Sequence, residues 1–186
     1  GTESTCAVQN GDVKCWGRAT DGQLGLGDTT DRGKNADEMG DRLPALNLGA
    51  SRSGTVQALS EGSQAHRFRC ALLTSGEVVC WGKGDSGQLG NGHNTNVGTE
   101  SSEMGDNLTS VDLGAGQSAI MLAVGERLAC AILANGGLKC WGDTNCYGDT
   151  EERGTSTSHM GDLLPTVDLG FNRTAVHVSL GKDHGC

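Results

Sequence analysis

The segment CALLTSGEVVCWG, residues 70–82, decides the fold of this chain. It places two cysteines at the ends of a hairpin-length stretch and follows the second with Trp-Gly. Related segments are CAVQNGDVKCWG at 6–17 and CAILANGGLKCWG at 130–142. With Cys186 opening a fourth copy, the first cysteines lie 64, 60 and 56 residues apart. A motif that recurs at this spacing indicates a repeat architecture.

Other landmarks recur in the same order within each period. A glycine-rich turn follows the first two hairpins, DGQLGLG at 21–27 and SGQLGNG at 86–92, whereas the third copy has NCYGD at 145–149. A polar loop then leads to Met-Gly-Asp and to LPALNLG, LTSVDLG or LPTVDLG. We assign the repeats to residues 1–69, 70–129 and 130–185, with residue 186 starting a fourth.

The residue pattern predicts short strands and almost no helix. The segments before NLG or DLG alternate apolar and polar residues, which is the period of a strand. A second strand follows at AIMLAV (119–124) and AVHVSL (175–180), and the cysteine hairpin adds two more. Four strands in each repeat are typical of a β-propeller blade. The predicted fold is therefore all-β, with about three blades of a larger ring.

These landmarks resemble the regulator of chromosome condensation (RCC) repeat family across the whole chain. The matching residues are the apolar strand after Cys70, the turn Ser75-Gly76, Cys80-Trp81-Gly82 and Gly87-Gln88-Leu89-Gly90, with His184 before Cys186 as a further match. The departures are Cys146-Tyr147-Gly148 and the residues Ser4, Phe68 and Leu128, where the family often has His. The resemblance implies a propeller, seven-bladed in the best-known members.

The hairpin turns predict which cysteines face each other. Asn10-Gly11 is a strong two-residue turn signal, and it places Cys6 opposite Cys15. The later copies are one residue longer and have glycine as the third loop residue, which restores the pairing in a three-residue loop. We therefore expect disulfides between facing cysteines at non-hydrogen-bonded pairs: Cys6–Cys15, Cys70–Cys80 and Cys130–Cys140.

Two other interpretations of these cysteines differ in what they predict for the thiols. Six buried thiols would also suit the pattern, because free cysteine packs as a small apolar residue. A zinc knuckle does not suit the wide spacing between the cysteines. Disulfides favour an extracellular or cell-surface location, reached by the secretory pathway. The sequons at Asn107 and Asn172 are permitted there as glycosylation sites.

The remaining cysteines, Cys146 and Cys186, have open assignments. Cys186 begins a fourth hairpin, so its expected partner follows the given sequence. Cys146 could pair outside this segment, pair with Cys186 or stay free. The sequence also begins and ends at the same point of its own repeat, from which we expect a segment of a longer protein.

Composition and motifs exclude several classes of function. The formal net charge is −9 and no Lys/Arg cluster occurs, so nucleic-acid binding is not expected. No apolar run long enough to span a membrane is present. The histidines are scattered, and no catalytic, metal or cofactor motif is found. We therefore expect a non-enzymatic module without a cofactor.

The polar loops vary while the hairpins repeat, which is typical of a recognition surface on a rigid scaffold. We expect protein–protein interaction or structural assembly, with a protein partner or further repeats of the same assembly. Candidate binding residues are Asp28, Asp31, Glu151 and Glu152. The resemblance implies one alternative, guanine-nucleotide exchange on a small GTPase with docking on chromatin. A glycan-binding propeller is a third possibility.

Overall fold

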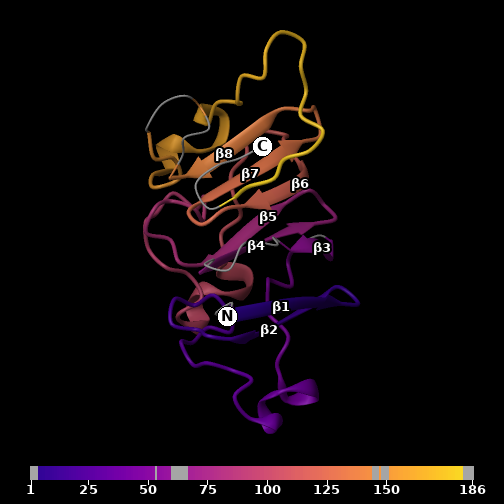
Figure 1. The fold of residues 1–186 in the computed structure, drawn as a ribbon, viewed down its shortest axis with the longest axis vertical. Helices are drawn as coiled ribbons and strands as arrows, with labels where there is room; N and C mark the ends of the chain where they lie inside the picture. The colour runs from indigo at the N-terminus through magenta and orange to yellow at the C-terminus, as the bar shows by residue number, and fades with distance from the viewer. Residues whose placement is uncertain (1–3, 53, 60–66, 144–146, 148–150, 182–186) are drawn as a thin grey trace.

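In this computed structural model, three antiparallel β-sheets are stacked face to face along the long axis of the molecule (Figure 1). The structure describes residues 4–52, 54–59, 67–143, 147 and 151–181. Each sheet is built around one cysteine hairpin, and we number the sheets as blades 1 to 3 in chain order. No α-helix occurs among the described residues, as the sequence predicted.

The strands have the following bounds. Blade 1 pairs β1 (Ser4–Gln9) with β2 (Asp12–Gly17). Blade 2 has the order β3 (Val56–Leu59), β4 (Phe68–Leu73) and β5 (Val78–Gly82). Blade 3 has the order β6 (Ala119–Val124), β7 (Leu128–Leu133) and β8 (Leu138–Gly142). The first strand of blades 2 and 3 thus comes from the end of the preceding sequence repeat.

Among the described residues, six short 3-10 helices lie in the segments that follow the three hairpins. They form three successive pairs, η1 and η2, η3 and η4, and η5 and η6, with bounds Ala36–Glu38, Gly40–Arg42, Ser101–Glu103, Gly105–Asn107, Thr157–His159 and Gly161–Leu163. The first helix of each pair precedes the repeated methionine and the second follows it.

The hairpin register is the predicted one. Cys6 lies opposite Cys15, Cys70 opposite Cys80 and Cys130 opposite Cys140. Asn10 and Gly11 both have positive φ, 54° and 87°, as a two-residue hairpin turn requires. Gly76 and Gly136 end the three-residue loops with φ of 82°. The different loop lengths therefore produce one common register.

The predicted fourth strand does not form. Residues 43–49, 108–114 and 164–170 approach the second hairpin strand through isolated contacts, such as the bond from Val111 N–H to Val78 O at 2.8 Å and the single bridge between Val79 and Ser110. Asp112 then accepts the N–H of Gly114 at 2.9 Å, and Asn47 and Asp168 make the same bond. A side chain that binds the backbone two residues later forms a turn and ends a strand.

Residues 175–180 also form no strand, although AVHVSL was predicted to. In blades 2 and 3 the equivalent segments, β3 and β6, pair with the first strand of the following hairpin. The hairpin that would follow residue 180 begins at Cys186, which lies outside the described residues. A strand needs this partner for its backbone hydrogen bonds.

Alternate residues of each blade face the two neighbouring layers. In β4 and β5, Ala71 and Trp81 pack against blade 1, whereas Cys70 and Cys80 pack against blade 3. In β7, Ala129 and Ala131 join the same cluster as Cys70, and Cys130 faces the opposite way. Each blade is therefore buried on both faces where it has two neighbours, and its cysteine pair lies on the face toward the following blade.

Candidate interaction surface

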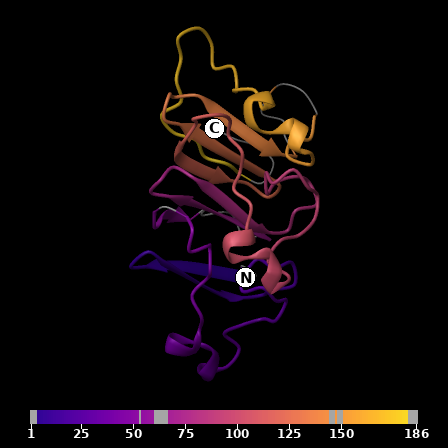
Figure 2. The same ribbon diagram turned by 180° about the vertical axis from the view of Figure 1, so that it is seen from behind.

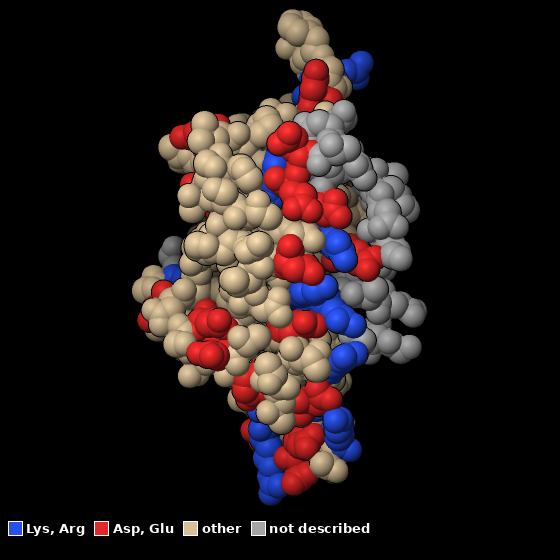
Figure 3. Space-filling view, turned by 90° about the vertical axis from the view of Figure 1, so that its left-hand side faces the viewer, with Lys and Arg blue, Asp and Glu red and all other residues tan. Residues whose placement is uncertain are grey.

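The three loops that follow Trp-Gly emerge on one edge of the stack, and the hairpin turns lie on the opposite edge (Figures 1 and 2). We call the side formed by residues 18–38, 83–103 and 151–159 the loop edge. Acidic and basic side chains lie next to one another along this edge (Figure 3). Acidic residues outnumber basic ones along the loop edge, but basic residues are interspersed among them, so we consider the loop edge as a surface for a protein partner rather than for a polyanion.

Each loop is closed by a pair of backbone hydrogen bonds at the glycine of Trp-Gly. Gly17 N–H donates to Arg32 O at 2.8 Å, and Arg32 N–H returns a bond of 2.9 Å. Gly82 forms the same bridge with Val97, and Gly142 with Arg153. These bridges fix the loop base in all three repeats, although the third loop is shorter.

Hydrogen bonds from backbone N–H groups to side chains recur at equivalent positions of the first two loops. Asp31 accepts the N–H of Ala19 at 2.9 Å, and Asn96 accepts that of Gly84 at 3.1 Å. Gln23, fully buried, accepts the N–H of Asp21 at 2.8 Å, as Gln88 does for Ser86. These hydrogen bonds fix the backbone conformation of the first two loops.

The Gly-Gln-Leu-Gly turn of one repeat receives the tryptophan of the next. Trp81 Nε1–H donates to Gln23 O at 3.2 Å, and Trp141 Nε1–H donates to Gln88 O at 3.0 Å. Both indoles are fully buried. Trp81 and Trp141 therefore lie in the core between blades, and they also join successive loops.

The 3-10 helices present small polar side chains at the loop tips. Glu103 accepts backbone N–H bonds from Gly98, Thr99 and Glu100 at 2.8 to 3.0 Å, which fixes the start of η3. Ser101 and Ser102 follow and are exposed. Glu38 fixes η1 in the same way through Lys34 and Asn35. The backbone of each tip is held while its outward side chains differ between repeats.

The four predicted binding residues separate into two groups. Asp28 accepts from Arg32 Nη2 at 2.6 Å and from Thr30 N–H at 2.8 Å. Asp31 contacts Lys34 Nζ at 2.9 Å, and this contact, with the Ala19 amide, holds the pKa of the Asp31 carboxyl below its usual value. These two carboxylates hold the loop together. Glu151 and Glu152 are exposed on the third loop.

A second set of contacts joins successive repeats beside the hairpin turns. Asp106 accepts the hydroxyl and the N–H of Ser51, at 2.6 and 2.9 Å, and these bonds lower the pKa of its carboxyl. Asp162 accepts the N–H of Ala115 at 3.0 Å in the same position of the next junction. The aspartate of Met-Gly-Asp thus binds the loop of the preceding repeat.

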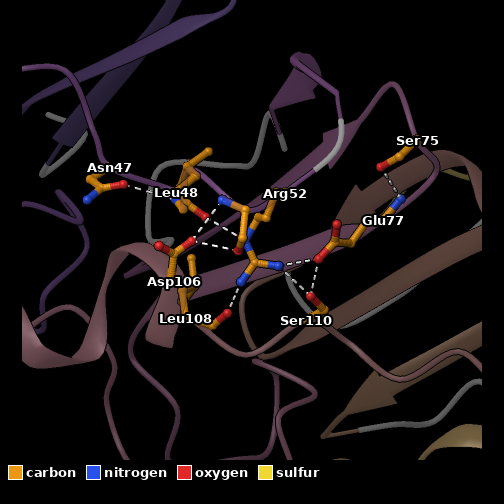
Figure 4. A network of polar contacts seen from close by, with 10 residues as sticks. Asn47, Leu48, Arg52, Ser75, Glu77, Asp106, Leu108 and Ser110 are labelled. Carbon is orange, nitrogen blue, oxygen red and sulfur yellow. Dashed lines mark hydrogen bonds and ion pairs between the residues drawn. The ribbon is translucent and has the colours of Figure 1, made fainter.

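A cation lies at each of these junctions, buried in the case of Lys139 and partly buried in the case of Arg52. Lys139 Nζ donates to Leu113 O and Gly161 O, both at 2.8 Å, and burial lowers the pKa of its ammonium. Between blades 1 and 2 this position is Val79, and Arg52 supplies the cation instead (Figure 4). Its guanidinium bonds to Glu77, to Ser110 Oγ at 2.6 Å and to the carbonyls of Leu48 and Leu108.

The third repeat replaces the Gly-Gln-Leu-Gly turn with Tyr147. Its hydroxyl accepts from Cys140 N–H at 2.9 Å and lies 3.0 Å from the carbonyls of Cys140 and Pro165. The Arg153 guanidinium stacks over the ring, 4.2 Å from its centroid. Tyr147 packs in the apolar cluster on the outer face of blade 3. In the first two loops Leu24 and Leu89, from the Gly-Gln-Leu-Gly turns, pack in the apolar clusters between the blades. Neither Tyr147, Arg52 nor Lys139 was recognised from the sequence as a structural contact.

The three facing cysteine pairs are joined as disulfides in the structure, with Cα–Cα distances of 4.1, 4.1 and 4.0 Å. These are the short distances of non-hydrogen-bonded cross-strand pairs. Cys146 and Cys186 lie outside the described residues. Of the sequons, Asn107 donates to Ser102 O at 3.0 Å, and Asn172 lies in an exposed turn.

No group of three or more His, Cys, Asp or Glu side chains suited to a metal ion occurs in the described part of the chain. Within the same residues, no helix has the length and apolar character needed to cross a membrane. Shallow hollows of about 240 and 250 Å³ lie beside the hairpin turns at Gly11 and Gly76. Both are lined by a mixture of apolar and polar residues, among them Leu46 and Arg52 in the first and Glu77 and Val111 in the second.

Stacked antiparallel blades, joined by tryptophans and loops that repeat from blade to blade, define this chain as part of a β-propeller. The sequence model of the regulator of chromosome condensation (RCC1) repeat matches residues 68–88, which include the second hairpin and its Gly-Gln turn. The second hairpin and the turn after it are therefore similar to an RCC1-type repeat, in a chain whose three hairpins each carry a disulfide.

Known proteins with similar sequences and folds agree with this. The ultraviolet-B receptor UVR8 of Arabidopsis thaliana is 29% identical over 199 residues, covering 99% of this chain and 37% of the receptor. The human E3 ubiquitin-protein ligase HERC2 is 30% identical over 145 residues, covering 77% of this chain and 3% of the ligase. Prp20p of Saccharomyces cerevisiae has a similar fold, with a TM-score of 0.63 and 15% identity over 98% of this chain and 41% of Prp20p. The chain therefore spans less than half of each.

Proposed function

We propose that this chain is a non-catalytic, disulfide-stapled propeller module of an extracellular or cell-surface protein, and that its loop edge binds a protein partner. The observation that carries the proposal is the position of the three disulfides. Each joins facing strands of one blade, and five of the six cysteines are at most 2% exposed. Disulfides of this structural kind are typical of oxidising compartments.

The loop edge supports the binding half of the proposal. Its backbone is fixed by the Trp-Gly bridges and by side-chain bonds within each loop, while the outward residues Ser101, Ser102, Thr157 and Ser158 are exposed. A preorganised loop loses little conformational freedom on binding. Interspersed charges of both signs suit a protein partner better than a polyanion.

A crosslinking experiment tests which edge binds. A photoreactive amino acid is placed at Ser102 or Thr157 on the loop edge, or at Ser75 or Asn135 in the hairpin turns, in the full-length protein made by cells of its source. All four positions are exposed. We expect one common protein crosslinked from Ser102 and Thr157 and absent from Ser75 and Asn135. Crosslinks from the hairpin turns alone would contradict the assignment of the binding edge.

A second candidate function has one observation in its favour. The fold resembles that of Prp20p, whose structure was described together with its binding to Gsp1p and histones. Nucleotide exchange on a small GTPase is therefore the alternative for this chain. Faster release of GDP from a small GTPase on addition of the full-length protein, lost on reversal of Glu151 and Glu152 to Lys, would favour the alternative over the non-catalytic proposal.

A further inference from the structure

The sequence contains three Asn-Gly pairs, and the structure places them in different surroundings. Asn10-Gly11 and Asn135-Gly136 lie in the turns of the first and third hairpins, and Asn91-Gly92 follows the Gly-Gln-Leu-Gly turn of the second loop. The side chain of an asparagine can react with the backbone nitrogen of a following glycine, which has no side chain to shield it. The reaction converts the asparagine to an acidic residue, so each pair is a candidate site of modification.

The reaction has two steps, and its co-reactant is water. In the first step the glycine nitrogen bonds to Cγ of the asparagine and the Cγ–Nδ2 bond breaks. The glycine amide proton leaves with Nδ2 as ammonia, and a succinimide ring remains. In the second step water opens the ring, giving aspartate by cleavage at Cγ or isoaspartate by cleavage at the main-chain carbonyl. Ring closure therefore requires a glycine N–H without an acceptor, an asparagine side chain free to turn and room for the peptide to rotate.

In the third hairpin the reacting groups of Asn135-Gly136 are held by hydrogen bonds. Gly136 N–H donates to Leu133 O at 2.8 Å, so the attacking nitrogen is occupied. Asn135 Nδ2–H donates to Gln117 Oε1 at 3.1 Å, and Oδ1 of the same side chain accepts the N–H of Gly137 at 2.9 Å. Ring closure at this pair has to break these bonds first.

In the second loop Asn91-Gly92 is held by packing. Gly92 is buried, and a Cβ built on it would lie 2.8 Å from the backbone nitrogen of Thr157 in the third loop. Asn91 Oδ1 accepts the N–H of His93 at 3.1 Å. The peptide that has to rotate is therefore covered by a neighbouring loop, and the side chain is already bonded.

The turn of the first hairpin has neither restraint. Asn10 and Gly11 lie between the paired residues Gln9 and Asp12, and Asn10 is exposed. Within the part of the chain that the structure describes, neither the Asn10 side chain nor the Gly11 N–H has a hydrogen-bond partner. The nearest atoms to a Cβ built on Gly11 belong to the side chain of Thr55 and not to backbone. This pair therefore meets the requirements of ring closure better than the other two.

A hairpin turn at this edge stays exposed when its blade has a neighbour on each side. Blade 2 is such a blade, and its equivalent turn is exposed at Thr74 and Ser75. Asn135 is likewise exposed in blade 3, so its protection comes from hydrogen bonds and not from burial. The access of water to Asn10 is therefore a property of the hairpin edge and does not depend on what precedes the first repeat.

We propose that Asn10 is a site of spontaneous deamidation, and that the fold protects Asn91 and Asn135 from the same reaction. The two products affect the hairpin differently. Aspartate keeps the backbone unchanged, and Asp-Gly favours the same two-residue turn as Asn-Gly. Isoaspartate carries the main chain through its side-chain carbon, so the turn becomes longer and no longer matches the pairing of Gln9 with Asp12. Both products place a new carboxylate beside Asp12.

Mass spectrometry of the folded full-length protein tests the proposal without any partner at the loop edge. The protein is incubated at mildly alkaline pH and digested, and the fraction of each Asn-Gly peptide that has exchanged its amide for an acid is followed with time. The same three segments are incubated as short peptides, and each rate in the protein is divided by the rate in its peptide. We expect the ratio for Asn10 to be at least about fivefold larger than those for Asn91 and Asn135, which react after local opening.

A variant connects this difference to the restraints. Gln117→Ala removes the acceptor of the Asn135 amide, and Gln117 is exposed, so the melting temperature should stay close to that of the original chain. Conversion at Asn135 should become faster in this variant, while conversion at Asn10 should keep its original rate and serve as the internal control.

Two results would overturn the proposal. One is a ratio for Asn91 or Asn135 that equals or exceeds the ratio for Asn10, because the fold would then not select the first turn. The other is an unchanged rate at Asn135 in Gln117→Ala, because hydrogen bonding of the side chain would then not be the source of its protection.

Discussion

The indole nitrogen of Trp141 lies 3.0 Å from the carbonyl oxygen of Gln88, and this bond joins the second and third blades. Trp81 and Gln23 form the same pair between the first and second blades. Each bond is buried, and each joins a hairpin strand to the base of a neighbouring loop. Packing between blades and the shape of the loop edge are therefore coupled through the tryptophans.

Replacing these tryptophans should destabilise the chain according to what each one contacts. Trp141→Phe and Trp81→Phe remove a buried donor, leave a carbonyl without its partner and open space in the core, so each should cost about 2 to 4 kcal/mol of unfolding free energy. Trp16→Phe, at the half-buried equivalent position, should cost less than about 1 kcal/mol. Urea denaturation of the three variants measures the order, and an equal loss for all three would contradict it.

Gly90 should tolerate no side chain. Its φ is 62°, and a Cβ there would meet Trp141 and Val111 within 3.0 Å. Gly90→Ala should therefore cost more than the roughly 1 kcal/mol expected from positive φ alone. Gly116→Ala is the matched control, since its φ is 67° and its Cβ would meet nothing within 4 Å. Equal melting temperatures for the two variants would show that contact with Trp141 is unimportant.

Acid should weaken the junction between blades 1 and 2. The Ser51 hydroxyl and amide hold the pKa of Asp106 below its unfolded value, so the charged carboxylate stabilises the folded chain. This stabilisation is present above the unfolded pKa, near 4, and is lost as pH falls through the folded pKa. The melting temperature of Asp106→Asn should be lower than that of the original chain at pH 7. The difference should shrink as the pH falls below the unfolded pKa and the carboxylate of Asp106 becomes protonated.

Asp12→Asn controls for the change in net charge in that experiment, because Asp12 is exposed in the first hairpin and faces Gln9. A difference between Asp106→Asn and the original chain that persists unchanged at pH 2 would contradict a role for the charged form. The same difference in Asp12→Asn would assign the effect to net charge.

Charge reversal on the loop edge should have different effects in the first and third loops. Glu151→Lys with Glu152→Lys alters exposed side chains and should weaken binding to a crosslinked partner while shifting the melting temperature by less than about 2 °C. Asp28→Lys with Asp31→Lys removes the contacts to Arg32 and Ala19, so it should lower the melting temperature as well. Calorimetry together with a binding assay separates the two outcomes.

The hairpins were predictable because their signals are local. Asn10-Gly11 and the glycines at 76 and 136 determine the loop conformation, and with it the facing of the cysteines. The failed strand at 108–114 illustrates the limit of periodicity. Val111 and Leu113 alternate with polar residues as in a strand, yet the carboxylate of Asp112 binds a local amide and ends the extended segment.

The contacts between repeats could not be predicted in the same way. Arg52 and Lys139 bind carbonyls at equivalent junctions but occupy different positions of the repeat, so comparison of the repeats conceals their shared role. Asp28 and Asp31 were identified as polar loop residues, although their hydrogen bonds within the loop depend on a bridge at Gly17. Only the alignment of Met-Gly-Asp across all three repeats offered a signal for Asp106 and Asp162.

The two strands of each cysteine hairpin are joined by a disulfide of their own, and peptide mapping without reduction measures these links. The full-length protein is isolated from its source, alkylated under denaturing conditions and digested. The structure predicts three linked pairs, Cys6–Cys15, Cys70–Cys80 and Cys130–Cys140, each released as two peptides after reduction. Alkylated free thiols at these six positions would contradict these disulfides and the extracellular location proposed from them.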